Sequence, residues 1–370
     1  HDKYRRFVPD CGNRADLNYL IGEMIGELNA GHTYVFGGDV DRGGARIPVG
    51  LLGIDLEDPE DADHPRIAHI VPGTSWNPSE RSPLDVPGCG VEEGDYLIAI
   101  GGEPVSAADN PLQLLEGKVG DAVEISYSAQ PDGTAAETCT VEPIGSERSI
   151  RYREWVERNR RQVAERSRGR IAYVHVPNMM QAGLVEFARA FYPSYHAQGM
   201  IIDDRYNTGG FVGDMIIDRL EREVWSMTKP REGLPIPNPE RGFNGHLAVL
   251  VNHDTGSNGE YFAEAIKIKG LAPIIGERTW GGAIGIEPHQ DLVDGGLTTP
   301  PQFAPYGLDG RWLIEGRGVE PDVEVAYPPS AALAGEDPQL DRAIDMLLER
   351  IEADPPAEPA PPAYPVKAKP

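Results

Sequence analysis

The stretch His246-Leu-Ala-Val-Leu-Val-Asn-His-Asp-Thr-Gly-Ser-Asn-Gly-Glu-Tyr-Phe-Ala-Glu-Ala-Ile-Lys-Ile-Lys269 has the pattern of a strand, a tight turn and a helix in direct succession. Its apolar start is typical of a buried strand, and helical periodicity begins at Ser257. A serine at such a turn has its hydroxyl held out from the sheet edge, beside helix N–H groups that lack internal partners. Because these N–H groups and the helix dipole stabilise an oxyanion, Ser257 is a candidate nucleophile.

The same serine also has a purely structural interpretation. Serine is a favoured helix N-cap, and Glu260 lies three residues later, where it completes a capping box. Taken alone, the segment favours the cap. The rest of the chain reverses that preference.

Around this stretch, short apolar runs alternate with helical patterns. Such alternation predicts βαβ units and a largely parallel sheet. The predicted strands are 170–176, 199–203, 247–251 and 273–275, and the predicted helices are 184–192, 213–225, 258–269 and 340–351. Residues 354–370 are a Pro/Ala-rich tail, which we expect to be disordered.

A second strand-to-helix turn contains Gly209-Gly210, within Ile201-Ile-Asp-Asp-Arg-Tyr-Asn-Thr-Gly-Gly-Phe211. Sites in open α/β sheets form at the carboxyl ends of strands, so this turn and Ser257 are predicted to face one crevice. Glycine lets the backbone approach a substrate closely, with its N–H toward an oxyanion.

Residues 46–144 differ in character, because they contain short strands separated by turn residues. Two of the predicted strands are 123–128 and 137–141, and a short helix is predicted at 110–115. The pattern Val91-x-x-Gly-Asp-x-Leu-Ile-x-Ile100, followed by Gly102-x-x-Val105 and Val119-Gly120, resembles a PDZ domain. Such a domain holds a peptide as an added strand on a sheet edge, often capturing its terminal carboxylate with backbone N–H groups. An amphipathic helix over 14–30 precedes this unit, and a charged helix over 147–168 follows it.

The bulk composition narrows the choice of partners. The chain has 370 residues and a net charge of −25, which argues against nucleic acid and anionic membranes as partners. No apolar run approaches the roughly 18 residues of a membrane helix. The three cysteines Cys11, Cys89 and Cys139 are widely spaced, so we predict neither a disulfide framework nor a zinc site. The same spacing predicts a reducing compartment.

Three segments together resemble the S41 clan of serine peptidases: Asp203-x-Arg205-x-Asn207-x-Gly209-Gly210, the turn at Ser257, and Gly276-Glu-Arg-Thr-Trp-Gly-Gly282. The resemblance implies a ClpP/crotonase-like α/β catalytic domain with an inserted PDZ domain. The C-terminal-processing branch of the clan uses a lysine that is absent here, where the run ends in Gly281-Gly282. The order of segments instead resembles the tricorn branch, which uses serine, histidine and glutamate.

The tricorn resemblance assigns roles to individual residues. It makes Ser257 the nucleophile, His32 in Gly31-His-Thr-Tyr34 the base, and Glu315 in Trp312-Leu-Ile-Glu315-Gly the acid that orients the site. It places the oxyanion hole at the backbone N–H groups of Gly210 and Asn258. The family has a serine where this chain has Gly31. No obvious aspartate matching the family's specificity pocket is present in 226–233.

The resemblance also implies the organisation of the chain. We expect a helical segment in 1–45, the PDZ-like domain in 46–144, the peptidase domain in 145–353 and the tail in 354–370. The chain starts at His1 as if inside a domain, so we expect a piece of a longer protein that lacks its β-propeller domains. A homo-oligomer (a hexamer by resemblance), a cytoplasmic location, unfolded oligopeptides as substrates and no metal or organic cofactor are likewise implied.

Two alternatives remain open. One is a catalytically silent protein in which the PDZ-like unit binds peptide ends, and it is motivated by Gly31. The other is a C-terminal-processing peptidase that uses Lys267 or Lys269 as its base, although both lie late on the helix that Ser257 opens.

Overall fold

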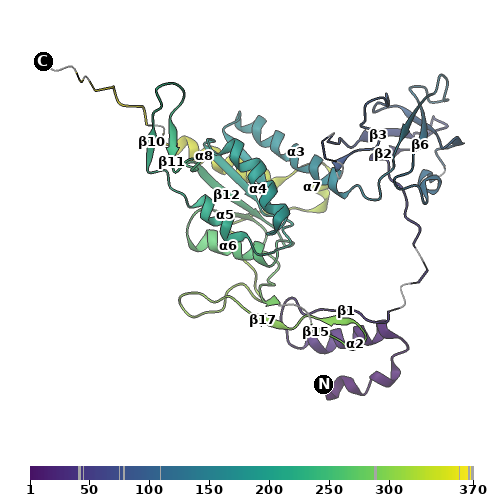
Figure 1. Ribbon diagram of the computed structural model, residues 1–370, viewed down its shortest axis with the longest axis horizontal. Helices are drawn as coiled ribbons and strands as arrows, with labels where there is room; N and C mark the ends of the chain where they lie inside the picture. Colours follow the sequence, from purple (N-terminus) through teal and green to yellow (C-terminus); the bar gives the residue numbers. More distant parts are fainter. Residues whose placement is uncertain are drawn as a thin grey trace. The chain divides into compact units, whose positions relative to one another are not determined.

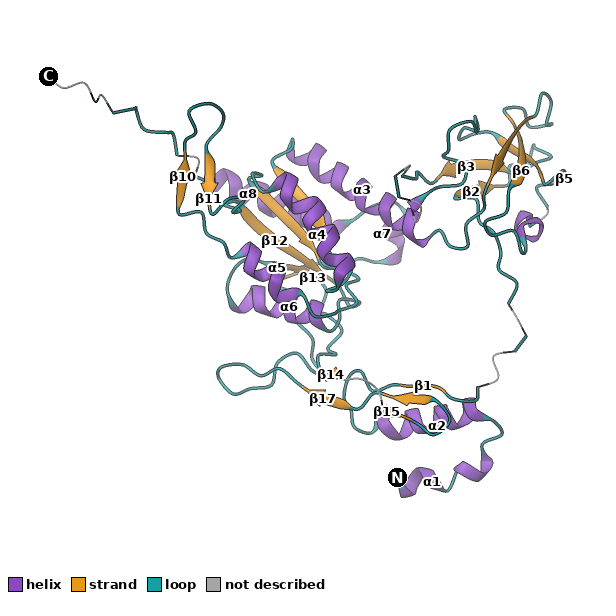
Figure 2. Cartoon of the chain, in the orientation of Figure 1, coloured by secondary structure: helices purple, strands orange, loops and turns teal. Residues whose placement is uncertain are grey.

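The structure of the protein is a computed structural model (Figure 1, Figure 2). It describes residues 1–40, 43–44, 46–74, 76–77, 80–108, 110–286, 290–357, 359–365 and 367, so parts of the predicted tail lie outside it. The chain divides into two compact units, one formed by 1–42 together with 159–370 and the other by 43–158. We call them the discontinuous unit and the inserted unit.

A five-stranded parallel sheet forms the centre of the discontinuous unit, which confirms the predicted α/β class. Its order is β18-β13-β12-β9-β8. The central strands are buried over nearly their whole length, as apolar runs between helices require. The strands are β8 (Ile171–His175), β9 (Gly199–Asp203), β12 (His246–Val251), β13 (Ile274–Gly276) and β18 (Val323–Glu324).

Helices cover this sheet and complete one apolar core. α8 packs across β9, β12 and β13, α4 packs on β8, and α5 packs against α6. Their bounds are α3 (Arg148–Ser167), α4 (Gln181–Ser194), α5 (Gly213–Leu220), α6 (Asn258–Ile268), α7 (Pro329–Leu333) and α8 (Pro338–Ala353). α5 ends five residues before the predicted end because Glu221-Arg-Glu continues no apolar face, and Trp225 is 79% exposed.

The N-terminal segment lies against the later part of the same unit. β1 pairs antiparallel with β16, and the Arg14 guanidinium forms an ion pair with Asp294. This pairing brings residues just before β1 to the loop that follows β13, where His32 lies against Trp280. The elements are α1 (Asp2–Arg5), η1 (Val8–Asp10), α2 (Arg14–Gly26), β1 (Val35–Gly37), β14 (Gly285–Ile286), β15 (Gln290–Asp291), β16 (Gly296–Thr298) and β17 (Pro301–Phe303).

A short exposed hairpin, β10 (Ser226–Thr228) with β11 (Ile236–Asn238), follows α5 and was not predicted. Among the helices of the described residues, none combines the length and the apolar character that a membrane span requires.

The inserted unit is a mainly antiparallel β-domain around its own core (Figure 2). The sheet order is β2-β3-β4-β6-β7, and β5 pairs with β4. Predicted strands 123–128 and 137–141 agree with the structure, whereas the predicted helix at 110–115 is a 3₁₀ helix. The elements are β2 (Ile54–Glu57), β3 (Arg66–Ile70), β4 (Tyr96–Ile100), β5 (Glu103–Pro104), η3 (Pro111–Leu115), β6 (Val123–Ser128) and β7 (Glu137–Val141).

The prediction that the cysteines form no disulfide is wrong. Cys89 and Cys139 are bonded, with Cα atoms 5.1 Å apart although 50 residues separate them in sequence. The antiparallel pairing of β6 and β7 fixes Cys139 beside Ile125 in the core, where the loop carrying Cys89 meets it. Sequence spacing alone does not reveal such a pair. Cys11 is a free thiol.

Candidate active site

Ser257 lies at the turn between β12 and α6, with φ 54° and ψ −122°. A non-glycine residue with positive φ is uncommon and is concentrated at functional sites. Its N–H donates to Glu260 Oε2 at 3.1 Å, which is half of the capping box. The Glu260 N–H also donates to the Ser257 carbonyl at 3.0 Å.

The Gly209-Gly210 turn lies directly against Ser257. A Cβ at Gly209 would come within 2.5 Å of Ser257 Cβ and 3.1 Å of the Asn258 nitrogen, and one at Gly210 within 2.0 Å of the Met179 carbonyl. Both positions therefore require glycine. The two backbone segments expected to form the oxyanion hole lie on either side of the serine.

Asn207 holds the Gly209 turn and the Ser257 turn together, a role that the sequence does not predict. Its Oδ1 accepts from the Gly209 N–H at 2.8 Å, and its carbonyl accepts from the Gly256 N–H at 2.9 Å. Its Nδ2 donates to Asp204 Oδ1 and to the Val176 carbonyl, both at 2.8 Å. The side chain and the backbone carbonyl of this fully buried residue thus fix the two turns.

A buried ion network lies behind the strand ends. The Arg205 guanidinium donates to Asp203 at 2.6 Å and to Asp337 at 2.9 Å. Burial alone would raise the pKa of Asp203, but Arg205 lowers it below the ordinary range. Arg205 is fully buried, so removing either partner would leave an unpaired charge. This part of the Asp-x-Arg motif is structural.

His32 also has positive φ, 60°, and lies next to the loop that follows β13. The hydroxyl of Thr299 holds it there by donating to the His32 carbonyl at 2.5 Å. The imidazole lies edge-on to the Trp280 ring, with centroids 5.1 Å apart. Burial lowers the pKa of His32 below its ordinary value, with Glu315 acting in the opposite direction. This shift favours the neutral imidazole, the form that a general base requires.

Glu315 holds the backbone next to His32. Its Oε1 accepts from the Gly31 N–H at 2.5 Å, and its Oε2 accepts from the N–H groups of Ala283 and Ile284, both at 2.8 Å. His32 Nδ1 is buried and has no hydrogen-bond partner in the described structure. Glu315 therefore fixes the chain that carries the base.

Glu260 holds the backbone next to Ser257, as Glu315 holds the backbone next to His32. Its Oε1 accepts from the Thr279 hydroxyl and the Gly281 N–H, both at 2.6 Å. Its Oε2 accepts from the N–H groups of Gly282, at 3.0 Å, and Ser257. Burial raises the pKa of Glu260 above its ordinary range, and these hydrogen bonds oppose the shift.

The segment 279–284 thus links the candidate nucleophile to the candidate base, because Glu260 and Glu315 hold its two halves. Trp280 completes the link. Its ring lies 3.1 Å from where a Cβ on Gly256 would be, and it also lies against the His32 ring. The sequence shows 279–284 only as a glycine-rich turn, so it gave no indication of these contacts.

The candidate lysine bases are engaged elsewhere. Lys267 Nζ lies 3.1 Å from Asp322 Oδ1, and Lys269 Nζ lies 2.7 Å from Glu221 Oε1. Neither contact involves Ser257, which argues against the C-terminal-processing alternative. Among the described residues, no group of three His, Cys, Asp or Glu side chains has the arrangement of a metal site.

Residues 170–325 match peptidase family S41, and residues 50–146 match the tricorn protease PDZ domain. Residues 170–325 are therefore a domain of peptidase family S41, a family of serine peptidases.

The chain is similar to tricorn proteases over nearly its whole length. It is 39% identical to tricorn protease of Thermoplasma acidophilum over 95% of its own length and 32% of that protein. It is 37% identical to tricorn protease homolog 1 of Streptomyces coelicolor, over 96% of this chain and 33% of that one. A crystal structure of tricorn protease, 38% identical, matches with a TM-score of 0.86 over 95% of this chain and 34% of the other. The chain spans about a third of the length of these relatives.

Proposed function

We propose that this chain is a tricorn-like serine endopeptidase that cleaves unfolded oligopeptides through an acyl-enzyme on Ser257. The observation that carries the proposal is the strained Ser257 turn, pressed against Gly209-Gly210 at the start of α6. The matches to tricorn proteases support the same interpretation.

In the proposed reaction, neutral His32 takes the proton of the Ser257 hydroxyl as the oxygen attacks the peptide carbonyl. The N–H groups of Gly210 and Asn258 stabilise the oxyanion, and His32 then protonates the leaving amine. Water hydrolyses the acyl-enzyme by the same route. Glu315 acts by holding Gly31 and the 283–284 backbone.

The direct test is labelling with a fluorophosphonate, followed by peptide mass spectrometry. We expect an adduct on Ser257 in the wild type, and strong loss of labelling in the folded His32→Ala variant. Ser257→Ala is the control for labelling at other serines. An unmodified Ser257 in protein that cleaves peptides would contradict the proposal.

One observation favours a second candidate, a silent peptide-binding protein. His32 Nδ1 has no partner in the described structure, and Gly31 offers no side chain to orient the ring. If the folded wild type binds peptides but neither labels nor cleaves, this second function stands.

We further propose that the chain assembles as a homo-oligomer, as the tricorn resemblance implies. The check is the mass in solution, compared with 40.3 kDa for one copy. The cytoplasmic location stays a prediction, and the Cys89–Cys139 disulfide argues against it because such bonds are rare in reducing compartments.

A further inference from the structure

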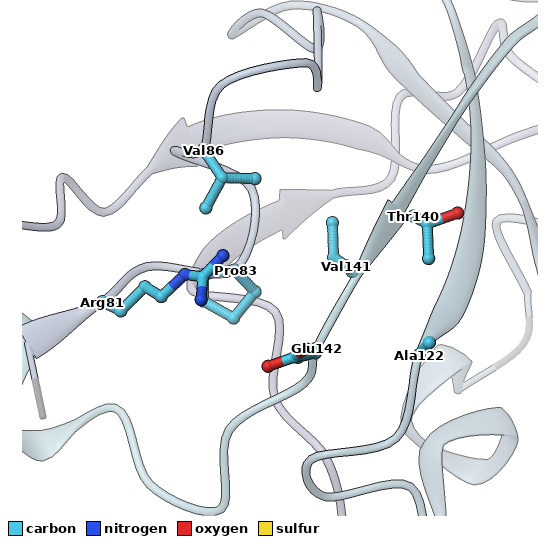
Figure 3. A pocket seen from close by; sticks show the side chains of 7 residues that line it. All are labelled: Arg81, Pro83, Val86, Ala122, Thr140, Val141 and Glu142. Carbon is cyan, nitrogen blue, oxygen red and sulfur yellow. The ribbon is translucent and has the colours of Figure 1, made fainter. Parts of the chain in front are cut away.

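A small cavity of about 90 Å³ lies in the inserted unit (Figure 3). Arg81, Thr140 and Glu142 line it together with apolar side chains. Small-molecule sites usually measure about 300–1,000 Å³, so this cavity is too small for a ligand of that kind. A buried carboxyl group next to the candidate active site supports a stronger inference.

Asp204 follows β9 directly and is linked to both turns of the candidate active site. The residue is fully buried, and its Oδ1 accepts from Asn207 Nδ2 at 2.8 Å. Asn207 in turn holds the Gly209 N–H through its own Oδ1. The Asp204 backbone carbonyl accepts from the hydroxyl of Thr255, two residues before Ser257, at 2.9 Å. The side chain therefore reaches the glycine turn, and the backbone reaches the serine turn.

The cation next to Asp204 in sequence is engaged elsewhere. The guanidinium of Arg205 is paired with Asp203 and Asp337. His175 on β8 donates from Nε2 to the Arg205 carbonyl at 3.0 Å, and burial lowers the pKa of this imidazole. In the part of the chain that the structure describes, no arginine, lysine or histidine is paired with Asp204, whose side-chain partner is Asn207.

The ionisable groups that do act on Asp204 are acids. Burial raises the pKa of Asp204 well above its ordinary value, and the charges of Asp203 and of Glu260 on α6 act in the same direction. The hydrogen bond from Asn207 opposes the shift. Asp204 Oδ2 is buried and has no hydrogen-bond partner among the described residues. A neutral O–H in such a place is costly, but an unpaired carboxylate is far more so.

We propose that Asp204 is buried as the uncharged acid and is a positioning residue for the proposed oxyanion hole, which it holds through Asn207. In this form the proton is on Oδ2, and Oδ1 accepts one hydrogen of Asn207 Nδ2. The other hydrogen of Nδ2 goes to the Val176 carbonyl, so both donors of the amide are engaged and its plane is fixed. The Asn207 oxygen must then face the Gly209 N–H. The positioning role rests on the proposed peptidase function, whereas the protonation state does not.

The protonation state is tested by urea unfolding of wild type and Asp204→Asn between pH 5.5 and 9. An acid whose pKa is raised by folding stabilises the folded state fully below its unfolded pKa, and this contribution is lost as the pH rises toward the folded pKa. Asparagine cannot ionise. The folding equilibrium constant of wild type relative to Asp204→Asn should therefore fall with rising pH, by up to about tenfold per pH unit.

Asp218→Asn is the matched control, because Asp218 is an exposed aspartate on α5. Its ratio to wild type should not change with pH. A wild-type to Asp204→Asn ratio that is constant, or that rises with pH, would show that Asp204 is charged in the folded protein and would overturn the proposal.

The positioning role is tested with two variants that lack an acceptor for Asn207, Asp204→Ala and Asp204→Leu, and with Asp204→Asn, which keeps one. Leucine fills the space, so it serves if the alanine variant does not fold. In either variant, hydrogen–deuterium exchange of segment 207–212 should be faster than in wild type. Fluorophosphonate labelling of Ser257 should be about tenfold slower, as expected for one lost hydrogen bond. Asp204→Asn should restore both rates toward wild type at pH 7.

The exchange measurement separates this proposal from the proposed function, because it does not require a reactive serine. Faster exchange in Asp204→Ala and Asp204→Leu alone, in protein that never labels, would support the link through Asn207 and contradict only the peptidase. Wild-type exchange and labelling in both of these variants would overturn the positioning role.

Discussion

Glu260→Gln is the substitution that most directly tests how the site is held together. Two donors reach each oxygen of Glu260: the Thr279 hydroxyl and Gly281 N–H on one, and the N–H groups of Gly282 and Ser257 on the other. A glutamine keeps one oxygen, so its NH₂ group must face one of these pairs.

The less costly orientation turns the NH₂ toward Thr279, because a hydroxyl can rotate and accept. The Gly281 N–H then loses its acceptor, and a buried donor left without a partner costs about 1–3 kcal/mol. Glutamine carries no charge, so the substitution removes the cost of burying the Glu260 carboxylate and offsets part of the loss in free energy of unfolding. We expect destabilisation near the lower end of that range. We also expect kcat to fall by about tenfold for each 1.4 kcal/mol of transition-state stabilisation lost as the 279–284 segment shifts.

The assay compares kcat, KM and fluorophosphonate labelling rate for wild type, Glu260→Gln and Glu264→Gln. Glu264 lies one turn further on α6, and its carboxylate is 3.9 Å from Arg317, so it is a matched control. A positioning role predicts a lower kcat and slower labelling in Glu260→Gln alone, with little change in KM. Wild-type kcat and thermal midpoint in Glu260→Gln would refute the reasoning.

Three further predictions concern the base and the inserted unit. Since burial lowers the pKa of His32, the acidic limb of kcat/KM should lie below pH 6.5, and Glu315→Gln should move it lower; a limb above 6.5 contradicts this. Gly31→Ala should reduce kcat/KM, because its Cβ would lie 2.9 Å from Gly282 Cα, and Gly31→Ser should recover part by placing a hydroxyl near Glu315. Cys89→Ser should lower the thermal midpoint under oxidising conditions by about as much as a reductant lowers the wild type.

Local patterns predicted the parts of the fold that local interactions determine. β9, β6 and β7 match their predicted ranges because each is an apolar or alternating run bounded by turn residues. The exposed hairpin of β10 and β11 was missed because its strands have three residues each and no buried face to give a pattern. The helical pattern predicted the first residue of α5, Gly213, correctly, but it placed the end of the helix at 225 and not at Leu220.

The sequence predicted which residues form the candidate site, but not the contacts among them. Ser257 and Gly210 were found because a strand-to-helix turn is visible in sequence, and His32 and Glu315 only through the family resemblance. Glu260 looked like half of a capping box, yet three of its four donors come from the glycine-rich turn 279–284. Such contacts depend on tertiary structure, so the sequence held no signal for them. The same is true of the Cys89–Cys139 bond.

The contact between Gly31 and Glu315 has a consequence for biosynthesis. These residues stand near opposite ends of the chain, with the whole inserted unit encoded between them. Because a nascent chain leaves the ribosome from its N-terminus, residues 1–42 emerge long before the partner that holds them. The candidate base therefore cannot be fixed in place by this contact until residue 315 has been made. Premature termination anywhere before residue 315 would release a fragment without this part of the site.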